Sequence, residues 1–122
     1  MKNETILLID DEVEILNLLE RFLTRKGYRV YTAENLAEGK RQIVEFEPDH
    51  LFLDINLPDG NGISALPSIL LGCPMIHIIL MSAEDHDNIK EKAKQNGAHG
   101  FLSKPFNFES IDIVLNNPFT KP

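Results

Sequence analysis

Short apolar runs alternate with longer segments of helical periodicity five times along this 122-residue chain. In the longer segments the apolar residues recur every three or four positions, which is typical of helices with one buried face. Regular alternation of strands and helices indicates repeated βα units around a parallel sheet. The predicted strands cover residues 5–9, 28–32, 51–54, 75–81 and 99–102, and the predicted helices cover residues 12–26, 36–46, 63–71, 85–96 and 108–115.

For three of these elements, the sequence also predicts how deeply they are buried in the fold. The strand at 75–81 is apolar at almost every position, which predicts burial on both faces, whereas the alternating strand at 28–32 is expected at an edge. The helix at 85–96 has only Ile89 and Ala93 as apolar anchors, so little apolar area holds it to the sheet. That helix is either a solvated surface helix or a weakly docked element that can shift or carry a partner surface.

Polar residues stand where the predicted strands end. In a parallel sheet the carboxyl ends of the strands lie along one edge, and α/β proteins bind ligands there. The sequence therefore predicts three acids, a hydroxyl and an amine at one site, which is a set suited to phosphoryl transfer to a carboxylate. These residues are Asp10, Asp11, Asp54, Ser82 and Lys104.

The adjacent carboxylates of Asp10 and Asp11 allow two interpretations. A hard cation such as Mg²⁺, which takes oxygen ligands, would relieve their repulsion. Alternatively, Asp11 caps the first helix while Asp10 is solvated, since Asp is common before a helix. Asp54 favours the metal, because three acids that converge without a cation destabilise one another.

Lys104 and Ser82 each have an ordinary structural explanation beside the functional one. Lys104 offers a mobile ammonium that can hold a phosphate or pair with Asp54, or it is a solvated loop lysine. Ser82 is either the N-cap of the fourth helix or a hydroxyl donor to a phosphoryl oxygen. Taken singly, these residues leave both alternatives open.

Composition narrows the classes of function. The length suits one domain, and 43% hydrophobic and 25% charged residues are ordinary for a globular protein. No apolar run approaches the roughly 20 residues that span a bilayer, and no signal peptide precedes the first strand, so we expect a cytoplasmic protein without membrane attachment. A net charge of -7 repels phosphate backbones, so this domain is not expected to bind nucleic acid directly.

Cysteine and histidine show no metal-binding pattern along the sequence. Cys73 is the only cysteine, so no internal disulfide forms, and its apolar neighbours favour a structural thiol. The four histidines show no ligand spacing with Cys73 or with one another, so no zinc site is expected. They are His50, His77, His86 and His99.

Together, the motifs at the strand ends resemble the receiver domain of two-component response regulators. The resemblance extends over residues 4–117 and implies the flavodoxin-like (βα)5 fold, a doubly wound parallel sheet with strand order 2-1-3-4-5. It implies a phosphorylation-activated switch that accepts a phosphoryl group from a histidine kinase or a histidine phosphotransfer protein. The motifs are Asp10-Asp11, Asp54 with Pro58 and Gly62, Ser82-Ala83, Gly97-Ala98 and Lys104-Pro105-Phe106.

The resemblance also implies a role for each site residue. Asp54 is the phosphorylated residue, and Lys104 and Ser82 bind the phosphoryl group. Mg²⁺ would be held by Asp11, Asp54 and the backbone carbonyl of Asn56. Asp10 would act mainly through a metal-bound water.

An output follows from the same resemblance. Phe101 stands at the switch-aromatic position, where many members have Tyr with a hydroxyl. Movement of Ser82 toward the phosphoryl group would let Phe101 rotate inward and shift the helix at 85–96. The face made by the fourth helix, the fifth strand and the last helix would then bind a dimer partner or an effector. Receivers similar to this chain often have a cis bond at the position of Lys104-Pro105.

Two rival functions share parts of this pattern. A haloacid-dehalogenase-like phosphatase also uses an aspartyl phosphate and Mg²⁺, but it has its nucleophile on the first strand and an acid/base Asp two residues later. Here Asn56 occupies that place after Asp54. A flavodoxin-like FMN carrier needs a phosphate-cradling loop after the first strand, where Asp10-Asp11-Glu12 would repel the phosphate. We therefore expect a phosphoacceptor switch that assists its own modification, not an enzyme acting on a separate substrate.

The domain organisation is predicted as a receiver domain over residues 1–117, with a tail or linker start over residues 118–122. The chain is either a stand-alone regulator or a receiver from a longer protein with an effector domain. A short last helix followed by Pro118 and Pro122 favours the longer protein.

Overall fold

The computed structural model describes residues 4–84 and 87–116. Within them, five parallel strands form one sheet in the order β2-β1-β3-β6-β7, which confirms the predicted order. The predicted tail and the predicted helix start at Asp85 lie outside the described residues. The strands are β1 (Thr5–Ile9), β2 (Arg29–Ala33), β3 (His50–Asp54), β6 (His77–Ser82) and β7 (Gly100–Ser103).

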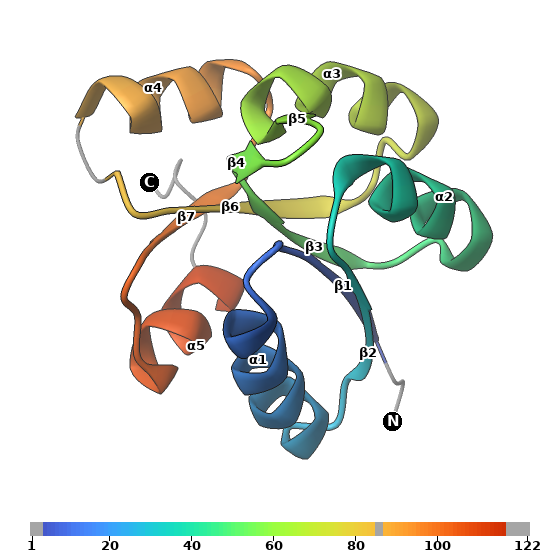
Figure 1. Cartoon of the computed structure of the whole chain (residues 1–122), viewed down its shortest axis with the longest axis vertical. Coiled ribbons are helices and arrows are strands. Elements are labelled where there is room, and N and C mark those ends of the chain that lie inside the picture. Colours follow the sequence, from blue (N-terminus) through green and yellow to red (C-terminus); the bar gives the residue numbers. More distant parts are fainter. Residues whose placement is uncertain (1–3, 85–86, 117–122) are drawn as a thin grey trace.

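Five helices of the described chain cover the two faces of this sheet (Figure 1). α1 and α5 lie on one face, and α2, α3 and α4 lie on the other, which confirms the predicted doubly wound, flavodoxin-like fold. None of these described helices is long and apolar enough to cross a membrane. The helices are α1 (Val13–Arg25), α2 (Leu36–Phe46), α3 (Gly62–Gly72), α4 (Asp87–Gln95) and α5 (Phe108–Asn116).

Each face of the sheet has its own hydrophobic core. Successive residues of a strand point to opposite faces. Leu8 and Phe52 therefore pack with α1 and α5, while Leu7 and Leu53 pack with α2 and α3. Because the central strands are buried on both faces, the residues that follow them are held in fixed positions.

Gly39 lets α2 lie close to β1. A Cβ at this position would collide with the side chain of Ile9. Glycine weakens a helix through its backbone entropy, and here that loss is offset by close packing of the helix on the sheet.

Two segments differ from the prediction. The fourth strand begins at His77, so Met75 and Ile76 are not part of it. The Ile76 N–H instead donates to the Cys73 carbonyl at 3.2 Å and closes a turn. The Met75 side chain is 91% exposed as a result. The loop predicted after Asp54 contains a small antiparallel hairpin of β4 (Asn56–Leu57) and β5 (Gly60–Asn61). Such short hydrogen-bonded turns produce no periodic pattern in the sequence.

α4 is weakly anchored, as its composition predicts. Of its described residues, Ala93 is buried and Ile89 packs against the core only partly buried. An element with so little buried apolar area can move at low free-energy cost.

Candidate functional site

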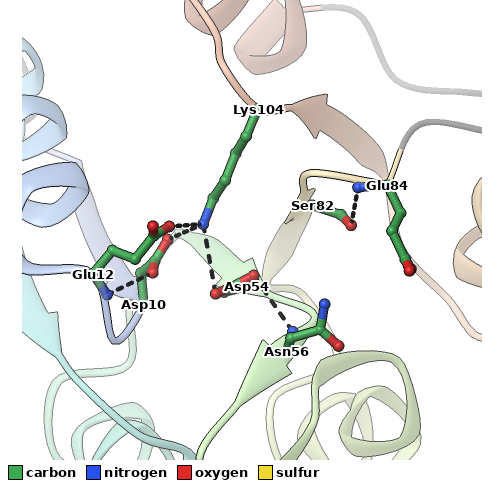
Figure 2. Close-up of polar contacts among 7 residues, drawn as sticks. All are labelled: Asp10, Glu12, Asp54, Asn56, Ser82, Glu84 and Lys104. Atoms are coloured by element: carbon green, nitrogen blue, oxygen red, sulfur yellow. Dashed lines mark hydrogen bonds and ion pairs between the residues drawn. The ribbon is translucent and has the colours of Figure 1, made fainter.

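Four neighbouring strands bring the predicted site residues to one edge of the sheet. Asp10 directly follows β1, Asp54 and Ser82 end β3 and β6, and Lys104 directly follows β7. The strand registers, such as Ser82 beside Ser103, align these ends. Figure 2 shows Asp10, Asp54 and Lys104 pointing toward one another. Residues from both ends of the chain thus meet at one place.

Asp10, Asp11 and Asp54 form an acidic cluster. One carboxylate oxygen from each lies within 4.8 Å of the others. Asp10 is fully buried and Asp54 is 5% exposed, whereas Asp11 is exposed. Buried carboxylates repel one another more strongly than exposed ones, because no water screens them. The three acids therefore converge as the sequence predicts.

Asp10 is held through both of its oxygens. Oδ1 accepts a hydrogen bond from the backbone N–H of Glu12 at 2.9 Å. Oδ2 accepts no hydrogen bond from any described residue, and the Lys104 ammonium lies 2.8 Å from it as an ion pair. Asp10 is fully buried, so the alternative of a solvated Asp10 is wrong. Asp11 does not cap α1 either, because the N-cap residue is Glu12 and no side chain caps this end of the helix.

Lys104 is the cation of the site. Its Nζ lies 2.7 Å from Glu12 Oε1, 2.8 Å from Asp10 Oδ2 and 3.5 Å from Asp54 Oδ2. Burial alone would lower its pKa, but the close contacts with the carboxylates of Asp10 and Glu12 and the charges of Asp10 and Asp54 raise the pKa of Lys104 to about 12. The side chain is 12% exposed, so the alternative of a solvated loop lysine is wrong.

The charge on Asp54 is unfavourable in spite of Lys104. Burial, and next the charge of Asp10, raise the pKa of Asp54 to about 6 against the lowering effect of Lys104. The backbone N–H of Asn56 donates only a long hydrogen bond of 3.4 Å to Oδ1. One ammonium therefore does not balance the acids gathered here.

A divalent cation fits this imbalance of charge. Carboxylate oxygens are the ligands that Mg²⁺ prefers, and the acidic cluster supplies three of them. Asn56 stands exposed beside Asp54 (Figure 2), so the fourth predicted metal residue also lies at this edge.

Ser82 is buried beside the acids. Its Oγ accepts a hydrogen bond from the backbone N–H of Glu84 at 2.9 Å (Figure 2). Ala83 and Glu84 are not helical, so the alternative in which Ser82 caps the fourth helix is wrong. A hydroxyl that accepts one bond in this way still has its own proton to donate.

Phe101 links the site's strands to α4. It lies on β7 in register with Leu80 of β6, and it is half-buried against the core. The Nζ of Lys90 on α4 lies 5.7 Å from the centroid of its ring. A movement of the Phe101 ring would therefore change its contact with α4.

Two acids at this edge make contacts that the sequence did not predict. Glu12 pairs with Lys104, although it stands 92 positions away. The two oxygens of Asp59 accept the N–H groups of Leu36 and Ala37 at 2.8 and 3.0 Å, and this ties the β4–β5 turn to the start of α2. The only sequence signal for Asp59 was its Pro-Asp-Gly turn, since both partners are distant along the chain.

Gly62 allows the chain to pass directly behind Asp54. A Cβ at position 62 would lie 2.5 Å from the carbonyl oxygen of Asp54 and 3.1 Å from the Cα of Ile55. Both are backbone atoms, so Gly62→Ala must displace the strand end that carries the acid. We expect it to lower the free energy of unfolding by about 1–3 kcal/mol and to shift the NMR signals of Asp54.

Gly72→Ala is the matched control, because Gly72 ends the same helix and a Cβ there meets no atom within 4 Å. Alanine is favoured over glycine in a helix by about 0.5–1 kcal/mol, so this variant should be neutral or slightly stabilised. Urea denaturation measures both changes. Equal losses in the two variants would contradict the close approach at Asp54.

Comparison with known proteins identifies the family. Residues 6–116 match the family model of the response regulator receiver domain. The chain is 38% identical over 106 residues to the transcriptional regulatory protein KdpE of Mycobacterium tuberculosis, covering 87% of this chain and 46% of that protein. It is 31% identical over 122 residues to the DNA-binding transcriptional regulator NtrC of Rhizobium meliloti, covering 100% of this chain and 25% of that protein. The chain thus spans less than half the length of these curated relatives.

Similar proteins of known structure have the same fold. The chemotaxis protein CheY4 of Vibrio cholerae superposes with a TM-score of 0.87 at 26% identity, over 93% of this chain and 97% of that one. A response regulator of Burkholderia pseudomallei superposes with a TM-score of 0.86 at 27% identity, over 93% of this chain and 66% of that one. That structure contains a phosphorylated aspartic acid, a calcium ion and citrate. With the doubly wound fold, the acidic edge and the match over residues 6–116, this chain belongs to the response regulator receiver domain family.

Proposed function

We propose that this receiver domain is a phosphorylation-activated switch in which Asp54 accepts a phosphoryl group from a phosphohistidine. The observation that carries the proposal is the position of Asp54: a buried carboxylate at a strand end, with Asp10 and Lys104 on one side and Ser82 on the next strand. The donor would be a histidine kinase or a histidine phosphotransfer protein. Family membership supports this donor, as does the acceptor chemistry of the site.

In the proposed transfer, a carboxylate oxygen of Asp54 attacks phosphorus while the bond from phosphorus to the donor imidazole breaks. The imidazole leaves with the electron pair and takes up a proton, and Asp54 becomes an acyl phosphate. With a pKa of about 6, Asp54 is mostly ionised at neutral pH and can act as the nucleophile. Hydrolysis by water would later release inorganic phosphate and restore the carboxylate.

The surrounding residues position the reacting groups. Mg²⁺, held by Asp11, Asp54 and the carbonyl of Asn56 with Asp10 nearby, would neutralise the charge on the phosphoryl oxygens. Lys104 lies 3.5 Å from Asp54 and can turn its ammonium from Glu12 to a phosphoryl oxygen. The Ser82 hydroxyl would donate a hydrogen bond to another phosphoryl oxygen.

Labelling with acetyl phosphate tests the proposal. In the presence of Mg²⁺, intact-mass measurement should show one added phosphoryl group per chain, and EDTA should prevent the addition. Sustained turnover of acetyl phosphate without a labelled intermediate would instead indicate a phosphatase. No labelling of the folded protein with Mg²⁺ present would refute the acceptor role.

The proposed output runs from Ser82 to α4. When the Ser82 hydroxyl moves toward the phosphoryl group, it draws along the loop that leads into α4, and Phe101 can rotate inward into the vacated space. α4 is free to follow, since little apolar area anchors it. Both states would exist before modification, and phosphorylation would bias the equilibrium between them. The changed surface would consist of α4, β7 and α5.

The variants Ser82→Ala and Phe101→Ala test whether the site is coupled to the surface formed by α4, β7 and α5. We expect both variants to accept beryllofluoride with Mg²⁺, but to lose most of the chemical-shift changes in α4 and α5 that the wild type shows. Two-dimensional NMR with and without beryllofluoride measures these changes. Absence of any change in the wild type over residues 87–116, while Asp54 is occupied, would contradict the proposed coupling.

The proposed setting of the domain follows from its relatives. Because the match covers less than half the length of these relatives, residues 1–117 would act as the receiver of a larger cytoplasmic regulator, with residues 118–122 as the tail or linker start. Relatives described as transcriptional regulators make a DNA-binding effector domain one candidate output. The α4-β7-α5 surface would bind that domain or a second receiver.

A further inference from the structure

A row of polar side chains crosses the sheet at the edge opposite to the acidic cluster. Glu4 precedes β1, His50 begins β3, His77 begins β6 and His99 precedes β7. His50 and His77 are paired in register. Because the strands are parallel, these residues gather at the amino-terminal edge, far from Asp54 at the other end of β3. None of them has a part in the proposed phosphoryl transfer.

The contacts along this row are short. The Nε2 of His50 lies 2.7 Å from Glu4 Oε1, and the Nδ1 of His50 lies 3.0 Å from the Nδ1 of His77. The ring centroids of His77 and His99, the next pair in the row, lie 5.4 Å apart. Sequence spacing predicted no zinc site at the histidines, because spacing detects only ligands that are close along one segment. These histidines are neighbours only across strands.

Hydrogen bonding determines where the protons lie. A carboxylate only accepts, so the Nε2 of His50 carries the proton that is shared with Glu4. In neutral His50 the Nδ1 lone pair then points at His77. A carboxylate on the far nitrogen of a histidine is the arrangement that orients metal-binding imidazoles in proteins. His99 differs, because its Nδ1 accepts the backbone N–H of Ile78 at 3.1 Å and is not available.

The contact between His50 and His77 joins two ring nitrogens, and only one of the two can carry the proton that lies between them. In the metal-free protein the Nδ1 proton of His77 can lie between the two rings. Its transfer through solvent to Nε2 would expose the second lone pair without net release of a proton.

We propose that His50 and His77 are the two protein ligands of a second metal site, for a transition-metal cation of the Ni²⁺ class, which takes square-planar or octahedral coordination. Metal–nitrogen bonds of about 2.0–2.1 Å across the 3.0 Å gap enclose an angle of about 95°, which suits neighbouring positions of a square-planar or octahedral ion. Glu4 orients His50, and water completes the coordination. Imidazole ligands favour such ions over Mg²⁺, which prefers the oxygens of the acidic cluster.

Titration with Ni²⁺ in excess Mg²⁺ tests this site, because the Mg²⁺ occupies the acidic cluster. Paramagnetic Ni²⁺ should broaden the NMR signals around residues 50 and 77 at less than one equivalent, and leave those around residue 54 sharp. His77→Gln and His50→Gln should each lower the Ni²⁺ affinity at least tenfold, and Glu4→Gln by about tenfold as an orienting group. His99→Gln is the matched control and should change it less than twofold.

Thermal unfolding provides a second measurement. Ni²⁺ should raise the melting temperature of the wild type and of His99→Gln, since a ligand that binds only the folded state stabilises it. It should not do so in folded His50→Gln or His77→Gln. Broadening confined to the acidic edge, or an affinity unchanged in both histidine variants, would show that the pair shares only a proton and would overturn the proposal.

Discussion

Replacing Lys104 with methionine is expected to lower the free energy of unfolding of the metal-free protein by about 3–5 kcal/mol, because the change leaves a buried charge without its partner. Asp10 is fully buried, and the Lys104 ammonium lies 2.8 Å from its Oδ2. Methionine keeps most of the apolar stem of lysine, so the loss of stability comes mainly from the loss of the ammonium charge. Urea denaturation in EDTA at neutral pH measures it.

Lys26→Met is the control for Lys104→Met. Lys26 and Asp112 form an ion pair at 2.9 Å with side chains 39% and 43% exposed. Exposed pairs contribute at most about 1 kcal/mol, so this variant should lose little. Added Mg²⁺ should restore part of the stability of Lys104→Met, since it supplies positive charge to the acids, and should have no such extra effect on Lys26→Met. Equal losses in EDTA would contradict a buried ion pair at the site.

Asp54→Asn is expected to stabilise the metal-free protein at neutral pH by about 1–3 kcal/mol, since one unit of pKa shift corresponds to about 1.4 kcal/mol. The pKa of Asp54 is raised from 3.8 to about 6 in the folded state. A raised pKa means that the folded state binds the proton more tightly, so ionised Asp54 lowers stability above pH 6. As the pH falls from 6 toward 4, the wild type should regain this stability and the difference between the two proteins should vanish.

Asp59→Asn should behave in the opposite way. The N–H groups of Leu36 and Ala37 lower the pKa of Asp59, so its ionised form is the stabilising one. Replacing the ionised carboxylate of Asp59 should therefore destabilise the protein at neutral pH and have less effect as the pH falls. Unfolding curves of both variants over this range, with EDTA present, compare the two acids. A stabilised Asp59→Asn, or a destabilised Asp54→Asn, would contradict the assignment of charge.

Most of the fold follows from the pattern of apolar residues. The helix Leu36–Phe46 was predicted with its observed limits, and Pro48 follows its end. The structure adds the cap at its start, where the Asn35 side chain accepts the N–H of Glu38 at 2.8 Å. The limits of the fourth strand were less accurate, because Met75 is as apolar as its neighbours and only the turn hydrogen bond from Ile76 excludes it. Hydrophobicity locates an element, whereas local hydrogen bonds decide where it ends.

The candidate site was predictable for a different reason. Asp54 ends one strand and Lys104 directly follows another, so the topology alone brings them to one edge. The pairing of Glu12 with Lys104 was not predictable, because it depends on the direction of two long side chains. The contact of His50 with His77 depends on strand register between residues that are 27 positions apart in the sequence. Contacts between side chains of distant segments leave no pattern in the sequence.

The measurement that tests the account most directly is mass mapping of the phosphoryl group after acetyl phosphate treatment with Mg²⁺. Wild-type protein and Asp54→Asn are treated together, digested under conditions that preserve acyl phosphate, and compared peptide by peptide. The predicted result is one phosphoryl group on the wild-type peptide that contains Asp54 and none anywhere on Asp54→Asn. Equal labelling of the two proteins, or a label on a peptide without residue 54, would contradict Asp54 as the acceptor.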